Sequence, residues 1–222
     1  SFFVGGLVAA LVPIANTGFR TELFTSLEGS PLYILLNANL QMMTMLNQIL
    51  IICGACLMYH TEYADHAIRR MLTLPLKGES LFFGKSFLLA LGFFFLLVLE
   101  SASYAFCTMH WFRMTDGFLP ELLKNMGFAA LLTLPTLLFM LLVASACQSM
   151  WVSLGIGVIF MSMGTVLPEG PFPLTLVPFV TPFKTLADAG SGWAAYAAAS
   201  GAELLLLALA ACMFIRIRRY SL

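Results

Sequence analysis

Long apolar stretches, separated by short polar or proline-rich ones, run through the whole chain. A helix that crosses roughly 30 Å of hydrocarbon needs about 20 mostly apolar residues. The alternation of short segments typical of a β-barrel does not occur. The pattern therefore predicts an all-α polytopic membrane protein, a single transmembrane domain over residues 1–222. The expected spans are six, at about 1–15, 31–59, 81–109, 121–147, 150–166 and 191–215.

The first apolar stretch is short for a span, because 15 helical residues reach only about 22 Å. It has no initiator methionine and no basic segment of the kind that opens a signal peptide. We therefore expect a first span whose beginning lies before Ser1. Residues 16–30 read as a polar connector, and Pro31 opens the second span.

The second span is unusually polar for a membrane helix. Spacings of four, three and four residues place one set of its polar side chains on a single helix face. Polar groups at membrane depth need partners or water. The face either lines a substrate path or a dimer seam, or it supplies hydrogen bonds between helices, and the spacing favours neither. Its members are Asn37, Gln41, Thr44 and Gln48.

A charged stretch follows the second span and has the periodicity of a helix. Thr61 is a plausible N-cap, acidic residues come first and arginines last, and this order complements the helix dipole. Pro75 ends the pattern. We expect a short amphipathic helix at about 61–73 near the membrane surface, with a solvated turn as the alternative. Its polar face holds Glu62, Asp65, His66, Arg69 and Thr73.

Two carboxylates lie inside predicted spans, Glu100 in the third and Glu203 in the sixth. An acid at membrane depth is costly, so each is a candidate functional residue, with a structural, hydrogen-bonded glutamate as the alternative. Glu203 is the weaker candidate because it lies nearer to the end of its span. Small residues along 150–166 predict close helix contacts. The five prolines of 168–182 exclude one continuous helix there and indicate a segment that dips into the interface or re-enters it.

Composition and charge agree with this class. The chain is 60% hydrophobic and 10% charged, with no net charge, so a lipid bilayer is the expected environment and no nucleic acid partner is implied. With both termini on one side, that side receives seven basic residues against four, which predicts cytoplasmic termini in the plasma membrane. The five cysteines lie in apolar stretches and read as packing residues.

No motif indicates catalysis within the chain. Gly84-Lys85-Ser86 resembles part of a phosphate-binding loop, but the glycine spacing is wrong and no strand precedes it. No metal-binding or nucleophile motif occurs. We therefore expect no enzyme activity, metal or cofactor in this chain, and a transport subunit that depends on an energised partner.

Three features together resemble ABC-2 type transporter permeases. They are His60-Thr61-Glu62-Tyr63, then Arg69-Arg70-Met71-Leu72-Thr73-Leu74-Pro75, then Lys85 at the start of the next span. The compact six-span plan is similar to type V exporters, and in particular to the permease subunits of lantibiotic self-protection and resistance exporters of Gram-positive bacteria.

The resemblance implies a separate cytoplasmic ATP-binding cassette ATPase, which holds ATP and Mg²⁺ and docks on the 61–73 coupling helix. It also implies a second permease, as a homodimer or heterodimer, and expulsion of a peptide antibiotic (lantibiotic or bacteriocin) from the membrane. The candidate docking residues are Glu62, Tyr63, Asp65, His66, Arg69 and Arg70.

Two other functions stay open at this stage. One is a membrane scaffold or sensor subunit that binds a partner through the same helix without transporting anything. The other is an ion-coupled carrier that uses Glu100.

Overall fold

The computed structural model describes residues 2–21, 24, 30–64, 78–112, 117–147, 149–167 and 175–220. Within these residues every regular element is a helix, so the all-α prediction is confirmed for this part of the chain. The elements are α1 (Phe2–Phe19), α3 (Pro31–Ala64), α5 (Gly78–Trp111), α6 (Phe118–Ala146), α7 (Met150–Val166), η1 (Thr181–Phe183), α9 (Leu186–Ala189), η2 (Gly190–Gly192) and α10 (Trp193–Tyr220).

Helices occupy all six stretches in which we expect spans. By length and composition, four helical stretches are apolar and long enough to cross a membrane: Pro31–Thr61, Glu79–Trp111, Phe118–Ala146 and Leu186–Ile217. Val4–Phe19 and Met150–Val166 are apolar but shorter, and 17 residues rise only about 26 Å. The helices fit a multi-pass membrane protein, and the six-span count stays a prediction.

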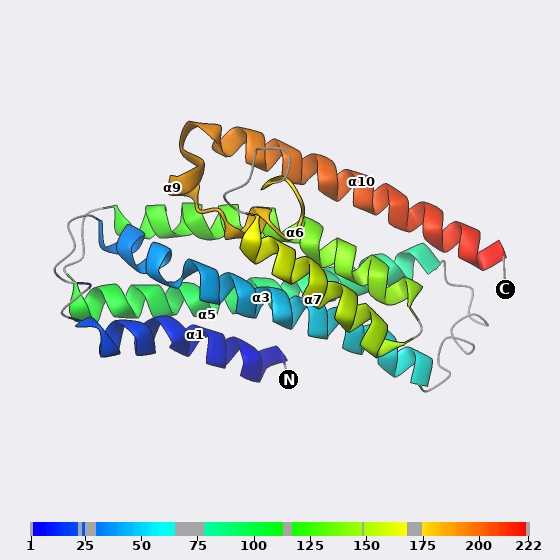
Figure 1. Ribbon diagram of the computed structural model, residues 1–222, viewed down its shortest axis with the longest axis horizontal. Coiled ribbons are helices and arrows are strands. Elements are labelled where there is room, and N and C mark those ends of the chain that lie inside the picture. Colours follow the sequence, from blue (N-terminus) through cyan, green and yellow to red (C-terminus); the bar gives the residue numbers. More distant parts are fainter. Residues whose placement is uncertain are drawn as a thin grey trace.

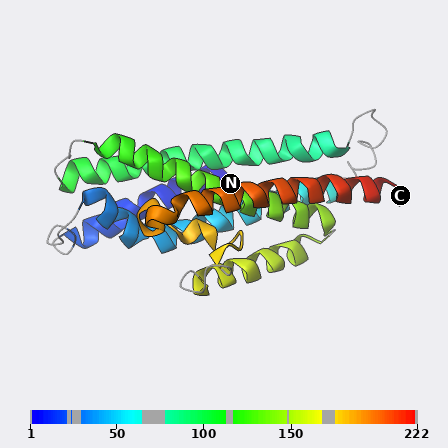
Figure 2. The ribbon, with the colours of Figure 1, turned by 90° about the horizontal axis from the view of Figure 1, so that it is seen from above.

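The helices run roughly along one common axis (Figure 1). α3 lies at the centre and packs against α1, α5, α6 and α7, whereas α10 packs against α6 and α5. In the view from above, α10 runs across the middle of the bundle and α7 lies along one edge (Figure 2). The end of α3, the start of α5 and the C-terminal end of α10 lie at one end of the bundle, and the start of α6 lies at the other (Figure 1).

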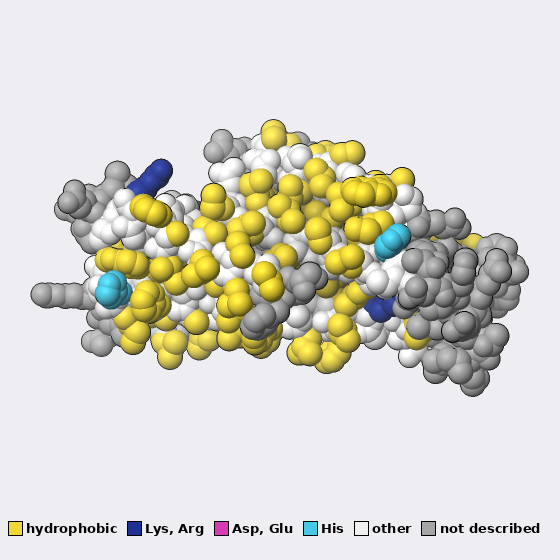
Figure 3. Space-filling view, turned by 90° about the horizontal axis from the view of Figure 1, so that it is seen from below, with side chains coloured by type: hydrophobic (Ala, Val, Ile, Leu, Met, Phe, Trp, Pro, Cys, Tyr) yellow, Lys and Arg dark blue, Asp and Glu magenta, His cyan; other side chains and the backbone are white. Residues whose placement is uncertain are grey.

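The exterior of the bundle is apolar along its middle. Figure 3 shows hydrophobic side chains over most of one face, with lysine, arginine and histidine side chains near the two ends. Half of the most apolar part of α6 is buried, against 11% of that of Leu186–Ile217. α6 is therefore a central helix, and α10 presents most of its apolar surface outward. A bilayer suits such a surface.

Small residues bring α7 close to its neighbours, as the sequence predicts. Ser153, Gly157 and Gly164 are buried. A Cβ at Gly157 would lie 2.7 Å from Cγ2 of Ile52, and one at Gly164 would collide with the backbone of Phe179. By contrast, a Cβ at Gly155 would meet nothing within 4 Å. Close approach thus depends on individual positions of α7.

The segment before α9 enters the bundle. Phe179 and Val180 are almost completely buried, and the Phe179 ring packs edge-on against Phe139 of α6 and lies near Phe160 of α7. For 168–182 the sequence predicts a segment that dips into the interface or re-enters it, and both alternatives stay predictions; residues 168–174 lie outside the described residues. Residues 175–182 fold back into the helix bundle, and we call them the re-entering segment. The backbone of this segment therefore needs partners inside the bundle.

Two predicted boundaries are wrong at the ends of helices. Thr61 does not cap a new helix, because α3 continues to Ala64 and the Thr61 hydroxyl donates to the carbonyl oxygen of Leu57 at 3.0 Å. α1 likewise continues to Phe19, into the expected polar connector. In both places the polar side chains are compatible with a continuing helix, because a threonine hydroxyl can bond to the preceding turn. Residues 65–73 of the expected coupling helix lie outside the described part.

Candidate functional site

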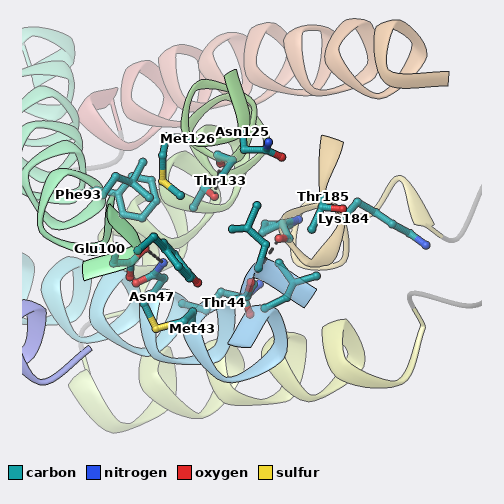
Figure 4. Close-up of a pocket in the computed structure, with 17 residues that line it drawn as sticks. Met43, Thr44, Asn47, Phe93, Glu100, Asn125, Met126, Thr133, Lys184 and Thr185 are labelled. Atoms are coloured by element: carbon teal, nitrogen blue, oxygen red, sulfur yellow. Dashed lines mark hydrogen bonds between the residues drawn. The ribbon is translucent and has the colours of Figure 1, made fainter. Parts of the chain in front are cut away.

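A small cavity of about 60 Å³ lies between α3, α5, α6 and the residues around η1. The polar side chains on its wall come from all four of these segments. Figure 4 shows Glu100 of α5 beside Asn47 of α3 on one side, and Lys184 extending away on another. The polar members of the lining are Thr44, Asn47, Gln48, Glu100, Tyr104, Asn125, Thr133, Lys184 and Thr185.

Glu100 accepts a hydrogen bond from a neighbouring helix. The side-chain nitrogen of Asn47 donates to Oε2 of Glu100 at 3.3 Å, and Glu100 is only 3% exposed. Among the described residues, Oε1 of Glu100 and Oδ1 of Asn47 are buried without a hydrogen-bond partner. A buried carboxyl with one unpaired oxygen is unusual, which makes this contact a candidate site.

The second half of the polar face holds the re-entering segment. Gln48 donates through Nε2 to the carbonyl oxygen of Phe179 at 2.9 Å, and Thr44 donates to that of Pro182 at 3.4 Å. From α6, the Thr136 hydroxyl donates to the carbonyl oxygen of Pro178. α3 and α6 thus satisfy backbone groups that no helix or strand satisfies.

The four residues of the predicted polar face do not share one environment. Thr44 and Gln48 are buried, whereas Asn37 and Gln41 are exposed. Asn39 and Asn47, which lie off that face, are also buried; Asn39 accepts from Asn16 of α1 at 2.9 Å. α3 packs against four neighbouring helices, so buried polar residues occur on more than one of its faces.

Sequence reasoning missed six polar members of the lining, which are Asn47, Tyr104, Asn125, Thr133, Lys184 and Thr185. Asn47 directly precedes Gln48 and points about 100° away from it around the helix, so a one-face rule excludes it. The available signal was Glu100 itself, since a carboxyl inside a bundle requires a donor on a neighbouring helix. Lys184 and Thr185 follow the proline-rich stretch and carried no signal.

Glu203 lies in a different place from Glu100. It is half-buried on α10 and is absent from the cavity lining. Its Oε2 atom and the Ser200 hydroxyl, one turn away, are buried without hydrogen-bond partners among the described residues. The structure therefore does not bring the two predicted intramembrane acids together.

Two of the predicted docking residues lie at the other end of α3. Glu62 and Tyr63 belong to its last turn, and Asp65, His66, Arg69 and Arg70 lie outside the described residues. Two described contacts mark this end: Arg216 of α10 pairs with Glu79 of α5 at 2.6 Å, and the Lys85 ammonium lies 3.6 Å from the centre of the Tyr59 ring. At this end of the bundle α5 therefore contacts both α3 and α10.

Comparison with known proteins gives one match. Residues 1–164 match the model of a family described as ABC-2 family transporter protein. No curated protein and no solved structure matches the chain. The matched residues include α1, α3, α5, α6 and most of α7, and so three of the four segments around the cavity. The chain belongs to the ABC-2 transporter family and is a membrane transport component.

Proposed function

We propose that this chain is the permease subunit of an ATP-binding cassette exporter that moves an amphiphilic peptide antibiotic, such as a lantibiotic, from the membrane to the outside. ABC-2 permeases generally work with a cytoplasmic ATPase. In this proposal the ATPase docks where α3 ends and α5 begins, and this end of the bundle is cytoplasmic together with both termini.

The continuity of α3 carries the proposal. A single helix of 34 residues, Pro31–Ala64, runs from the cavity to the proposed docking end. Gln48 and the last turn of α3 are about 20 Å apart along the helix axis. A helix is a rigid element, so a tilt imposed near Glu62 also displaces Thr44 and Gln48. Because these side chains bind the backbone of Pro182 and Phe179, the tilt moves the re-entering segment.

That segment closes the outer end of the path in our proposal. Its contacts reach three helices: Gln48 on α3, Thr136 on α6 and Gly164 on α7. Movement of α3 relative to α6 and α7 breaks some of these contacts and retains others. Such a two-state element is what coupling between a nucleotide site and a distant gate requires.

The experiment targets the docking end. Cells that express the chain with the ATPase of a neighbouring gene are challenged with a lantibiotic, and Glu62→Gln and Arg69→Gln are compared with wild type. Both variants should reach the membrane at normal levels and lose at least about tenfold in tolerated antibiotic, while ATP hydrolysis continues. Lys124→Gln is the matched control, because Lys124 is exposed on α6 outside this end and its loss should leave protection unchanged.

The outcomes separate the competing functions. Full protection by both docking variants would contradict the docking role. Wild-type cells that gain no protection over cells with the ATPase alone would favour a scaffold or sensor. Protection that follows the proton gradient instead of ATP would indicate an ion-coupled carrier.

A further inference from the structure

The cavity presents acceptor oxygens that have no donors. Oε1 of Glu100, Oδ1 of Asn47 and Oε1 of Gln48 are buried and lack hydrogen-bond partners among the described residues. All three side chains line the same cavity, with exposed fractions of 3%, 9% and 0%. Leaving a buried acceptor unpaired costs about 1–3 kcal/mol. Three of them around one cavity indicate a ligand that supplies donors.

The contacts of the amides fix which of their atoms are left unpaired. A backbone carbonyl only accepts, so the Gln48 nitrogen must face Phe179, 2.9 Å away, and the Gln48 oxygen is left over. In the same way the Asn47 nitrogen faces Oε2 of Glu100. Flipping either amide would place two acceptors against each other. The unpaired set is therefore three oxygens.

The charges around the cavity also favour a ligand that supplies donors. Lys184 is the only lysine, arginine or histidine among the described residues that line the cavity, and its side chain extends away from Glu100 (Figure 4). Among the described residues Glu100 forms no ion pair. Its hydrogen-bond partner is the side-chain amide of Asn47. A carboxylate in such a place favours a cation that carries its own donors.

The volume of the cavity and the number of unpaired oxygens limit which cation can bind. In the measure used for cavities, one water needs about 10–15 Å³, so about 60 Å³ admits a head group and excludes a peptide. An alkylammonium has three N–H donors for the three oxygens. Calcium prefers six to eight oxygen ligands, more than the set provides. Leu40, Met43 and Phe93 supply apolar wall against which a methylene stem packs.

We propose that the cavity binds one primary alkylammonium group, with Glu100 as counter-ion and Asn47 and Gln48 as acceptors. The identity of this group rests on the proposed function: it is an amine of the exported amphiphile. Amine-bearing compounds are then the preferred cargo. Gln48 connects occupancy to the gate, because its amide spans from the cavity to the carbonyl oxygen of Phe179.

Direct binding of n-butylammonium tests the site without any transport. The full chain in lipid nanodiscs is unfolded thermally in butylammonium chloride, in sodium chloride of equal strength and in n-butanol, the uncharged analogue. Butylammonium alone should raise the midpoint by about 3 °C or more near saturation. In wild type the infrared carboxylate bands should change on binding, and Glu100→Gln should abolish both responses.

Glu203→Gln is the matched control, since it removes a half-buried carboxyl group that does not line the cavity, and it should keep both responses. Equal responses to sodium, to butanol or in Glu100→Gln would overturn the proposal. If Glu100→Gln does not fold, the thermal response of Gln48→Met and the infrared change of the wild-type protein take its place as the test of the site. If the chain protects cells but the purified protein does not respond to butylammonium, this site is rejected and the proposed function is not. An ammonium response without protection rejects the proposed transport and leaves the site standing.

Discussion

Glu100 and Glu203 have similar sequence surroundings, each a single carboxylate inside an apolar helix, but the structure places them in different regions. Glu100 lies between three helices, is 3% exposed and accepts from Asn47. Glu203 is half-buried on α10, and no described residue donates to its buried Oε2 atom. The difference shows that helix hydropathy identifies a costly residue, whereas neighbouring helices determine whether a site forms around it.

The two regions also differ in how closely their backbones pack. Around Glu100, α3, α6 and α7 all contact the re-entering segment, and Gly164 has no room for a Cβ. Around Glu203, a Cβ added at Gly201 would meet nothing within 4 Å. Substitutions of the same chemistry in the two regions should therefore have unequal effects.

The largest effect is expected for Gly164→Ala. The new Cβ would lie 3.1 Å from the carbonyl carbon of Phe179 and closer still to its oxygen, so the re-entering segment must shift. Overpacking of this kind costs about 1–3 kcal/mol, and the Gln48 contact should be lost. Thermal unfolding in nanodiscs should show a midpoint lower by about 2–12 °C, together with loss of antibiotic protection.

Gly155→Ala and Gly201→Ala are the matched controls for that change. Both glycines are helical and have open space beside them, and alanine is the better helix former by up to about 1 kcal/mol. Both variants should be as stable as wild type or slightly more stable. Equal destabilisation by all three substitutions would remove the difference between the two regions.

A smaller effect is expected from Asn47→Leu. This variant deprives Glu100 of its described donor, and hydrogen bonds inside membrane proteins are worth about 0.6–2 kcal/mol. The double variant Asn47→Leu/Glu100→Leu should recover most of the loss, since replacing both partners by apolar groups is nearly neutral. Unfolding free energies of the four proteins form a double-mutant cycle. Glu203→Leu, with no described partner to lose, should not depend on Asn47.

The sequence predicted the helices well and the site only partly. Apolar length locates α3, α5, α6, α7 and α10 because membrane helices must satisfy their backbone internally. Spacing correctly marks Thr44 and Gln48 as polar groups on one face, but their partners lie 138 and 131 residues away. Such distances are invisible to periodicity, which explains why the gate contacts appear only in the folded chain.

Single residues show where local rules fail. Five prolines exclude one continuous helix across 168–182, but they do not reveal that Gly164 admits Phe179 into the bundle. Thr61 has the residue type of an N-cap and instead bonds back to Leu57, because a threonine hydroxyl serves both purposes. Asn47 was missed because α3 has no single buried face. Each failure concerns a partner chosen by tertiary packing.

The smallest effect is expected where α10 meets the start of α5. Arg216 pairs with Glu79 at 2.6 Å, but the Arg216 side chain is 70% exposed, and exposed pairs contribute about 0–1 kcal/mol. If α10 is held mainly by its packing on α6, then Arg216→Gln should lower the unfolding midpoint by about 4 °C at most. That small loss should vanish in 1 M sodium chloride, where screening acts over about 3 Å.

The charge-swapped protein, Arg216→Glu with Glu79→Arg, is the control for this pair, since it restores opposite charges and should match wild type. A loss from Arg216→Gln that exceeds the loss from Asn47→Leu and persists in 1 M salt would contradict the expectation. In that case an exposed contact at the far end of α10, and not apolar packing along α6, would position Glu203. The contrast between the two glutamates would then depend on the docking end of the bundle, where the proposed ATPase acts.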